Sequence, residues 1–529
     1  MSGLSARAAR VVRAGRAGLN AACVVLGAAC VVPSVSCGPP PPGVAGGIAP
    51  RRALAGSILR DDRVIIGRGS VIRAVGVARR FVYAVTSDAV LVYDRDRRAW
   101  LPPFTRDGGF DPSLVRAVAV DPDDDGAWLI TAMGAWTLQP LTAFVTRAPA
   151  GPLPARLRAS TLESVYREFP SLEAFGRLLS RDDRSLQSYP VISGARAPDR
   201  TEVWLGTAGG GLLQVDPLFN RAEPIVYGLA VSGAGAIARA ADGVWIAPAS
   251  RVAEPRLAIT FTTSDLQRWR WIDDASRREF GGARATALVT GEGVLWMGTT
   301  RGLFRVPLDA GGARAFTTIN GLPSEIVLSL LYRRERLWIG TASGLAQFHI
   351  DSADGGRQSV ALVPAPRVPV RALFATGDTT WIGTDAGLFL AAPGDTDRLV
   401  PPAAASTQPR LRQSVRAIAG ADSAVFVALA DGVLAFSVRS GGWREPFAAV
   451  PWRTVGDIDA LAADARTLWA GGPLGVLAID RATGGSRILR TGSDLPDAVT
   501  GIVLDGPWAW IATLGGVVRV RRSSDGLVP

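Results

Sequence analysis

Apolar residues along this chain alternate in short runs that glycine-containing turns interrupt, and one such pattern recurs ten times. Its clearest copies read LWMGTTRGLFRV, LWIGTASGLAQF and TWIGTDAGLFLA. Short apolar runs bounded by turn residues are typical of β-strands. Each copy has one aromatic residue, its anchor, ahead of a small residue or Gly-Thr. The ten anchors are Tyr83, Trp128, Trp204, Trp245, Trp296, Trp338, Trp381, Phe426, Trp469 and Trp510.

The spacing of the anchors predicts the fold. Successive anchors lie 41 to 51 residues apart, except for one gap of 76 residues between Trp128 and Trp204. A repeat of about 43 residues that holds several short strands is typical of the four-stranded blades of a β-propeller. The sequence therefore predicts an all-β propeller of about ten blades over residues 60–529.

The ends of this region predict how the ring closes. The last repeat supplies three strands, and DRVIIG, residues 62–67, is a single strand ahead of the first repeat. Pairing this strand with the last three removes two unpaired sheet edges, which would otherwise promote aggregation. We therefore expect one closed ring of ten blades. Two smaller propellers, or a ring of eight or nine blades with one repeat outside, are the alternatives.

The long gap marks an insertion at about residues 150–188. Within it, STLESVYREF and SLEAFGRLLSRDD place apolar residues at helical spacing, and Ser160 with Glu163 fits a capping box. Two interpretations are open: a helical flap over the face that carries the glycine hairpins, or a helix pair that seals the flank of a blade.

Glycine stands six residues after the anchor in eight of the ten repeats. This regularity indicates a hairpin that needs a positive φ, which glycine adopts without a steric penalty. It does not indicate a phosphate-binding loop.

The first 36 residues have the pattern of a signal peptide, with arginines followed by an apolar run. Ser-Val-Ser-Cys37-Gly then leads into a Pro/Gly-rich linker over residues 37–59, as at the lipid attachment site of a bacterial lipoprotein. Cys30 is a rival attachment site, and a simple cleaved signal or an uncleaved membrane anchor are alternatives. In each case we expect the propeller in the periplasm or at the cell surface, with an outer-membrane lipoprotein favoured.

The charge of the chain adds little to this picture. The formal net charge is +11, and arginine supplies all the basic side chains apart from the single histidine. These arginines are scattered among nearly as many carboxylates, without the basic runs or aromatic stripes of nucleic-acid-binding proteins. We expect no nucleic-acid partner.

One group of side chains suggests a binding site. The position ten residues before the anchor begins the inner strand of each blade, next to the central channel. Arginine occupies it at Arg73, Arg371 and Arg416, and at Arg116 after a two-residue shift, each time in the motif aliphatic-Arg-Ala-aliphatic, and Asp459 occupies it in one repeat. These arginines either neutralise nearby carboxylates or form a cationic port for an anionic ligand. The ligand-binding candidates are Arg73, Arg116, Arg371, Arg416 and Asp459.

Signals for catalysis are sparse. His349 is the single histidine and lies within a strand pattern, and no His/Cys cluster or nucleophile elbow is present in the sequence. The loop DPDDDG has the first half of a calcium loop, but Ala132 stands where the bidentate Glu belongs. We expect no catalytic residue, no metal and no cofactor.

The stretch GLPSEIVLSLLYRRERLWIGTASGLAQFHID, residues 321–351, resembles the two-component regulator propeller repeat family. GVLWMGTTRGLFRV and residues 379–389 are similar to the same repeat. The resemblance implies an extracytoplasmic, sensor-type propeller. Members usually carry a membrane helix and a histidine kinase, and these 529 residues contain neither a second hydrophobic span nor kinase motifs.

The favoured hypothesis is a non-catalytic, sensor-like propeller outside the cytoplasm that recognises an anionic glycan, a peptide or a protein of the envelope or of a signalling system. One alternative is a polysaccharide lyase or hydrolase that uses a channel carboxylate such as Asp459 with an arginine. Another is a structural subunit of an envelope complex.

Overall fold

The computed structural model describes residues 63–522, apart from 106–108, 122–123, 143, 174–188, 220, 232, 250–257, 274–282, 309–312, 352–356, 392–398, 422–423 and 448. These residues belong to one compact unit, Gly56–Pro529. The expected signal peptide, linker and lipidation site lie outside the described residues, as does most of the second expected helix. In the described part, no helix is long and apolar enough to cross a membrane.

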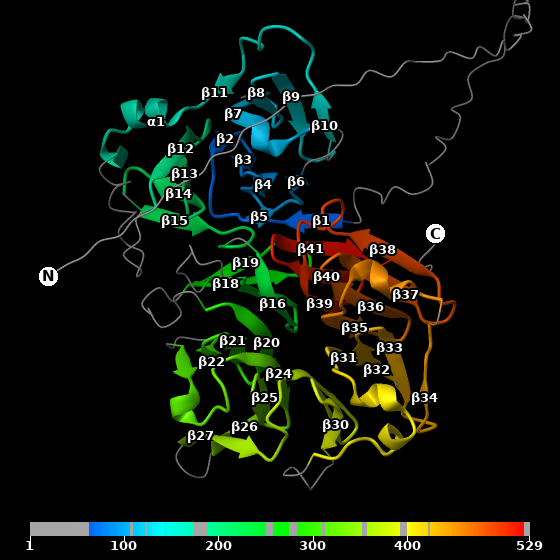
Figure 1. Ribbon diagram of the computed structural model, residues 1–529. Helices are drawn as coiled ribbons and strands as arrows, with labels where there is room; N and C mark the ends of the chain where they lie inside the picture. Colours follow the sequence, from blue (N-terminus) through cyan, green and yellow to red (C-terminus); the bar gives the residue numbers. More distant parts are fainter. Residues whose placement is uncertain are drawn as a thin grey trace, which may run out of the picture. The chain divides into compact units, whose positions relative to one another are not determined.

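The ten expected repeats are confirmed as ten antiparallel sheets, and we number the blades in chain order (Figure 1). The first three blades contain β2 (Ala74–Val77), β3 (Phe81–Val85), β4 (Ala89–Asp94), β5 (Ala99–Trp100) and β6 (Phe104–Thr105); β7 (Val115–Val120), β8 (Ala127–Thr131), β9 (Gly134–Gln139), β10 (Phe144–Arg147) and β11 (Arg158–Ala159); and β12 (Val191–Arg196), β13 (Val203–Thr207), β14 (Leu212–Asp216) and β15 (Arg221–Ile225).

Blades 4 to 6 each have four strands: β16 (Ala234–Arg239), β17 (Gly243–Pro248), β18 (Ala258–Thr263) and β19 (Trp269–Asp273); β20 (Ala285–Gly291), β21 (Val294–Thr299), β22 (Gly302–Pro307) and β23 (Arg314–Phe316); and β24 (Val327–Arg333), β25 (Arg336–Thr341), β26 (Gly344–Asp351) and β27 (Arg357–Val363). Blade 7 has three, β28 (Val370–Thr376), β29 (Thr379–Thr384) and β30 (Gly387–Ala391), and its outer edge carries a single bridge between Leu390 and Val400.

Blades 8 to 10 again have four strands each: β31 (Ala417–Ala421), β32 (Ala424–Leu429), β33 (Gly432–Ser437) and β34 (Trp443–Arg444); β35 (Ala460–Ala463), β36 (Thr467–Gly472), β37 (Gly475–Asp480) and β38 (Ser486–Arg490); and β39 (Val499–Asp505), β40 (Trp508–Thr513) and β41 (Gly516–Arg521) with β1 (Arg63–Ile66). Between the strands lie the short 3-10 helices η2 (Pro112–Leu114), η4 (Thr318–Asn320), η5 (Ala403–Ser406), η6 (Pro409–Arg412) and η7 (Trp452–Val455).

The N-terminal strand completes the last blade, as the sequence predicts. β1 pairs antiparallel with β41, and Ile66 lies opposite Val517. Ile66 is fully buried, in a cluster with Trp510 and Ile246 of blade 4. The first and last described strands therefore meet in one sheet, in which β1 covers the edge of β41 and supplies the outer strand of the last blade.

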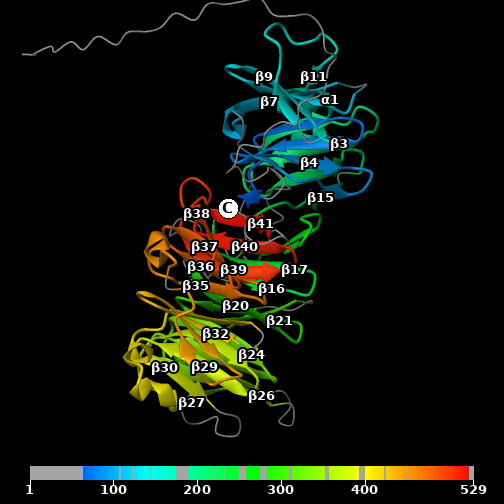
Figure 2. The same ribbon diagram turned by 90° about the vertical axis from the view of Figure 1, so that its right-hand side faces the viewer.

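The blades do not form one ring of ten, and that expectation is wrong. The inner strands β16, β20, β24, β28, β31, β35 and β39 lie side by side in this order, and β39 lies again beside β16. Blades 4 to 10 thus close a ring of seven, the green to red part of Figures 1 and 2. The remaining blades form a separate arc of three, in which β2 lies between β12 and β7.

The pairing of β1 with β41 specifies that the first and last strands share blade 10. It does not specify which blade packs next to blade 10. After β1 the chain leaves the ring, builds the arc, and returns to begin blade 4. The two crossing segments run together, with the Gly69 amide donating to the Leu229 carbonyl and the Leu229 amide to the Gly67 carbonyl, both at 3.0 Å. A Cβ on Gly69 would lie 1.7 Å from the Tyr227 carbonyl oxygen, so this crossing requires glycine.

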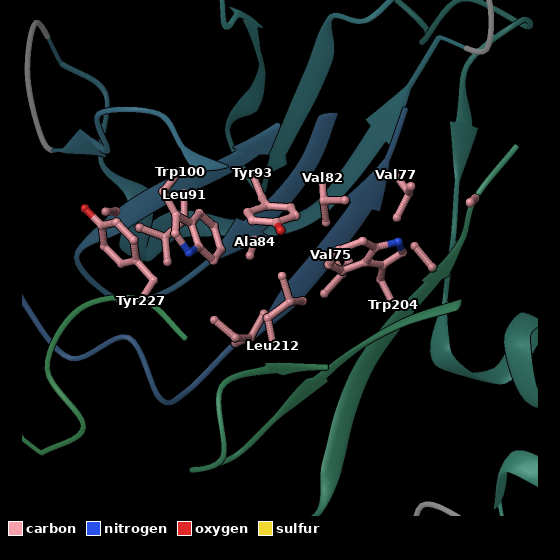
Figure 3. Packing of buried hydrophobic residues seen from close by; sticks show 14 residues of the cluster. Val75, Val77, Val82, Ala84, Leu91, Tyr93, Trp100, Trp204, Leu212 and Tyr227 are labelled. Atoms are coloured by element: carbon pink, nitrogen blue, oxygen red, sulfur yellow. The ribbon is translucent and has the colours of Figure 1, made fainter. Parts of the chain in front are cut away.

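The core lies between blades and is built around the anchors. Figure 3 shows the contact between blades 3 and 1, where Trp204 faces Val75, Val77 and Ala84. Trp204 is fully buried there, and its ring centroid is 5.6 Å from that of Tyr93. Large flat side chains of this kind bury much apolar area in a thin layer.

The hairpins after the anchors have the expected conformation at seven of the eight predicted glycines, where φ lies between +116° and +157°. The exception is Gly210, whose role passes to Gly211 at +81°. Threonine explains the Gly-Thr part of the motif. In blade 6, for example, the Thr341 hydroxyl donates to the Gly344 carbonyl at 2.8 Å and closes the turn.

The described part of the insertion lies on a blade flank, whereas most of the second helix of the expected pair lies outside the described residues. Its helix α1 (Leu162–Glu168) begins at Thr161, which forms a capping box with Ser164 in place of the expected Ser160 and Glu163. Val165 of α1, together with Leu172, packs on Val203 of blade 3. The helix therefore covers the side of blade 3, and the expected flap is not seen among the described residues.

Ring closure predicts a specific stability effect. Ile66→Ala removes a fully buried side chain from β1 and should lower the free energy of unfolding by about 2–5 kcal/mol in urea titrations. Ile319, which is 93% exposed in the ring, provides the matched control, and Ile319→Ala should change it by less than about 0.5 kcal/mol. Equal effects of both changes would show that β1 does not hold the ring closed.

Candidate functional site at the mouth of the ring channel

Each inner strand of the ring begins with a residue that stands outside the regular ladder. In five blades the pairing register slips at this point, for example between Val370 and Ala372 in blade 7. Such a bulge frees one residue from the ladder and redirects its side chain. The free residues of these blades are Gly235, Thr286, Leu328, Arg371 and Thr500.

Arg416 and Asp459 hold the same place in blades 8 and 9, directly before the inner strand. Their backbone amides donate to the Ala428 and Gly471 carbonyls of the neighbouring strands. All seven residues line one cavity of about 220 Å³, together with Arg284 and Val499. The structure therefore brings Arg371, Arg416 and Asp459 of the sequence candidates together at the mouth of the ring channel.

Arg371 is held by a carboxylate from a hairpin of its own blade. Its Nε and Nη2 donate to Asp385 Oδ1 and Oδ2 at 2.5 and 2.8 Å. The Ser414 hydroxyl donates to Asp385 Oδ1 at 2.7 Å. The bond from Arg371 lowers the pKa of Asp385 below its ordinary value, and the same bond raises the pKa of Arg371.

Arg416 bridges to the next blade. Its Nε donates to Asp459 Oδ1 at 2.9 Å, and its Nη1 lies 3.3 Å from Asp457 Oδ2. Two of the three cations at the mouth are thus already neutralised by carboxylates. A ligand anion would have to share these arginines with aspartates, which is the situation that the neutralisation interpretation expects.

Arg284 is the third cation, and the sequence argument missed it. Its backbone amide donates to the Thr300 hydroxyl at 3.2 Å. Its side chain is exposed and forms no ion pair with the described residues. It lies two residues before the bulge residue Thr286, outside the position that was counted from the anchors. An Arg-X-Thr pattern at the start of an inner strand is the signal that could have located it.

The hydroxyls at the mouth bind the neighbouring blade. Thr286 donates to the Val327 carbonyl and Thr500 to the Ala234 carbonyl, both at 2.6 Å. Their protons are used in these bonds, so they offer a ligand acceptor lone pairs only. The side chains at this mouth that can donate hydrogen bonds to an anion are therefore the guanidinium groups.

Arg73 and Arg116 lie elsewhere, in the arc of three blades. Arg73 donates to the backbone carbonyls of Thr86, Pro112 and Ser113 at 2.8 to 3.0 Å and thereby ties blade 1 to blade 2. Arg116 occupies the bulge of β7 and is exposed. The two do not line the cavity at the ring mouth, because their blades are not part of the ring.

The other residues that the sequence singled out have structural places. His349 lies within β26, between Arg336 of β25 and Ser359 of β27. Asp121 forms an ion pair with Arg156, whereas Asp125 accepts from the Arg80 amide at 2.9 Å. These two carboxylates of the DPDDDG loop are therefore engaged with different partners.

Comparisons with known proteins add the following. No family model matches the chain, and no curated protein matches it. Similar solved structures include PorZ, a surface component of the type-IX secretion system of Porphyromonas gingivalis, at 10% identity, with 85% of this chain and 68% of that chain covered and a TM-score of 0.43. The extracellular domain of a one-component system of B. thetaiotaomicron has 14% identity, 86% and 70% coverage and a TM-score of 0.26.

The WD40 propeller domain of Doa1 has 10% identity, covers 56% of this chain and 95% of its own, and has a TM-score of 0.41. Scores this low carry no argument about function. The propeller fold rests on the sheet topology of the chain itself.

The pKa of Asp385 predicts a pH effect on stability. A carboxyl whose pKa is lower in the folded state stabilises the fold at neutral pH, and this contribution disappears as pH falls through the folded-state pKa. Asp385→Asn should therefore lower the urea midpoint at pH 7, and the difference from the unsubstituted chain should shrink toward pH 3. Asp378→Asn, which changes an exposed carboxylate in the β28–β29 turn, is the control. A deficit for Asp385→Asn that stays constant from pH 7 to pH 3 would contradict the assignment.

Proposed function

We propose that the seven-bladed ring is a non-catalytic, sensor-like binding module outside the cytoplasm, which recognises a carboxylate or sulfate group of an acidic glycan or peptide at its channel mouth. The observation that carries the proposal is that the first residues of seven inner strands line one cavity together with Arg284, which has no ion pair among the residues that the structure describes. The resemblance to sensor-type propeller repeats and the signal-like N-terminus support the location.

The charges at the mouth set the expected affinity. Arg284 offers a charge-assisted hydrogen bond worth about 1.5–3 kcal/mol, and sharing of Arg371 with Asp385 lowers the gain from the second cation. One full contact and one shared contact together supply less than about 6 kcal/mol, and the cost of immobilising the ligand reduces this gain, so we expect these contacts alone to give a dissociation constant in the millimolar range or weaker. Neutral analogues lose the ionic contacts and should bind more weakly.

The enzyme alternative finds less support at this mouth. Asp459, the carboxylate that a lyase or hydrolase would use, already accepts from Arg416 through Nε at 2.9 Å and lies 2.7 Å from its Nη2. Asp385 is likewise paired, and its pKa is displaced downward, away from the range that proton transfer at neutral pH requires. A structural role in an envelope complex remains as the second candidate, and absence of any acidic ligand would favour it.

Calorimetry with a panel of carboxylated and sulfated glycans, acidic peptides and neutral analogues tests the binding proposal. Arg284→Ala should weaken binding of the best acidic ligand about 10- to 150-fold, since one charge-assisted bond is lost. The affinity should also fall as salt rises, because the mouth is open to solvent.

The arc provides the matched control for this experiment. Arg116→Ala removes an exposed bulge arginine of the same kind from a blade outside the ring, so the affinity should stay unchanged. Equal affinities of the Arg284→Ala protein and the unsubstituted chain, or no preference for anions, would refute the port.

We also propose that Cys37 carries a lipid anchor, on the sequence pattern alone, since it lies outside the described residues. Metabolic labelling with a palmitate analogue should mark the chain and the Cys30→Ser variant equally, and the mark should disappear in Cys37→Ser. Label that persists in Cys37→Ser but disappears in Cys30→Ser would move the anchor to Cys30.

A further inference from the structure

Among the described residues, one anchor packs on no neighbouring blade, and one blade surface receives no anchor. Each anchor points from its blade toward the next one, and nine of the ten are at most 5% exposed. Trp128 of blade 2 is the exception: it is half-buried and belongs to none of the buried clusters of the described residues. It is the anchor at the end of the three-blade arc.

The surfaces that receive the anchors follow one rule. The residues directly before and after the anchor of a blade face the preceding blade, as Val244 and Ile246 of blade 4 do where they pack on Trp510. In blade 3 these positions are Val203 and Leu205, and α1 covers them in place of an anchor. The arc therefore has one anchor without a receiving surface and one receiving surface without an anchor, on its two opposite flanks.

The face that carries Trp128, which we call the Trp128 face, has the composition of a blade contact. Strand register places Ala119, Trp128, Thr137 and Thr146 in one row across the sheet, and Ala117, Ile130 and Ala135 in the next. The two threonine hydroxyls bond each other at 2.8 Å, and neither row contains a charge. A large indole beside small alanines forms an apolar face of the kind that partners cover.

We propose that the Trp128 face docks the receiving surface of blade 3 of a second copy of this chain, for which α1 competes. The occupant follows from the match on the page: within the described chain, the blade 3 surface is the receiving surface that has no anchor. Two arcs related by a two-fold axis would form two such contacts and close six blades, a number within the common propeller range of four to eight. This proposal goes beyond ligand binding at the ring mouth and does not depend on it.

The cap on blade 3 is suited to such a competition. Helix α1 has seven residues, too few to be stable without the surface it covers. The buried contacts of the cap to blade 3 come from Val165 of α1 and from Leu172 beyond the end of α1, whereas an incoming blade would cover the same surface with a whole sheet. The intramolecular cap therefore keeps the chain monomeric at low concentration, and loss of the cap favours the dimer.

Sedimentation equilibrium of the purified full chain tests this competition. Val165→Asp with Leu172→Asp places carboxylates under the helix and should strengthen dimerisation at least about tenfold, and adding Trp128→Glu should return the protein to monomers. Thr161→Gly removes the N-cap side chain, which accepts from the Ser164 amide at 3.1 Å, without changing the core. This variant should also strengthen dimerisation, by a smaller amount. It keeps the proposal testable if the double change unfolds blade 3.

A surface variant as control and cross-linking across the proposed contact complete the test. Ile319→Glu, at a 93% exposed ring position, should leave dimerisation unchanged. In a background with Cys23→Ser, Cys30→Ser and Cys37→Ser, which removes all three cysteines of the chain, a Thr137→Cys chain and a Leu213→Cys chain, both with a weakened cap, should cross-link to each other when mixed. Monomers in all cap variants, dimers that Trp128→Glu does not weaken, or cross-linking of Thr137→Cys chains only with themselves would overturn the proposal.

Discussion

The contact on which this structure depends is the packing of one aromatic anchor against the aliphatic residues that flank the next anchor. Trp204 on blade 1, Trp510 on blade 4 and Trp296 on blade 6 are three copies of it. Because the anchor leaves one side of a blade and the receiving residues lie on the other, the contact has a direction and repeats from blade to blade. A chain of such contacts either returns to its start, as in the ring, or has two ends, as in the arc, where α1 covers one end and Trp128 stands half-buried at the other.

This direction explains which features the sequence could predict. The anchor spacing, the hairpin glycines such as Gly387 and the pairing of residues 63–66 with the last strand are local or follow from the avoidance of free edges. The number of blades in the ring is different, because all ten repeats carry similar anchors and similar receiving residues. Nothing in the pattern says that blade 10 packs on blade 4 and not on blade 1. The crossing at Gly69 and Leu229, which separates the arc from the ring, has only a glycine as its sequence signal.

The candidate site was partly predictable for the same reason. Counting from the anchors located Arg371, Arg416 and Asp459 at one cavity, since their blades are ring members. The same count predicted that Arg73 and Arg116 lie beside them. It could not show that the blades of these two arginines lie outside the ring. The count located one compensating carboxylate, Asp459, but missed two others. Asp385 comes from a hairpin and Asp457 from a loop, and both reach the arginines through the tertiary fold, so the sequence overestimated the positive charge of the mouth.

The repeats themselves show a pattern at the mouth that supports the proposed site. Across the seven ring blades, the residue before the bulge position is buried and apolar, and the residue after it is small, as Val370 and Ala372 are in blade 7. The bulge position between them holds Gly, Thr, Leu, Arg, Arg, Asp and Thr in turn. Blade packing constrains the two neighbours because they contact the adjacent blades, whereas the bulge side chain is outside the ladder and faces the channel. The fold thus fixes seven backbone positions around one opening, and blade packing does not constrain the side chains that these positions carry.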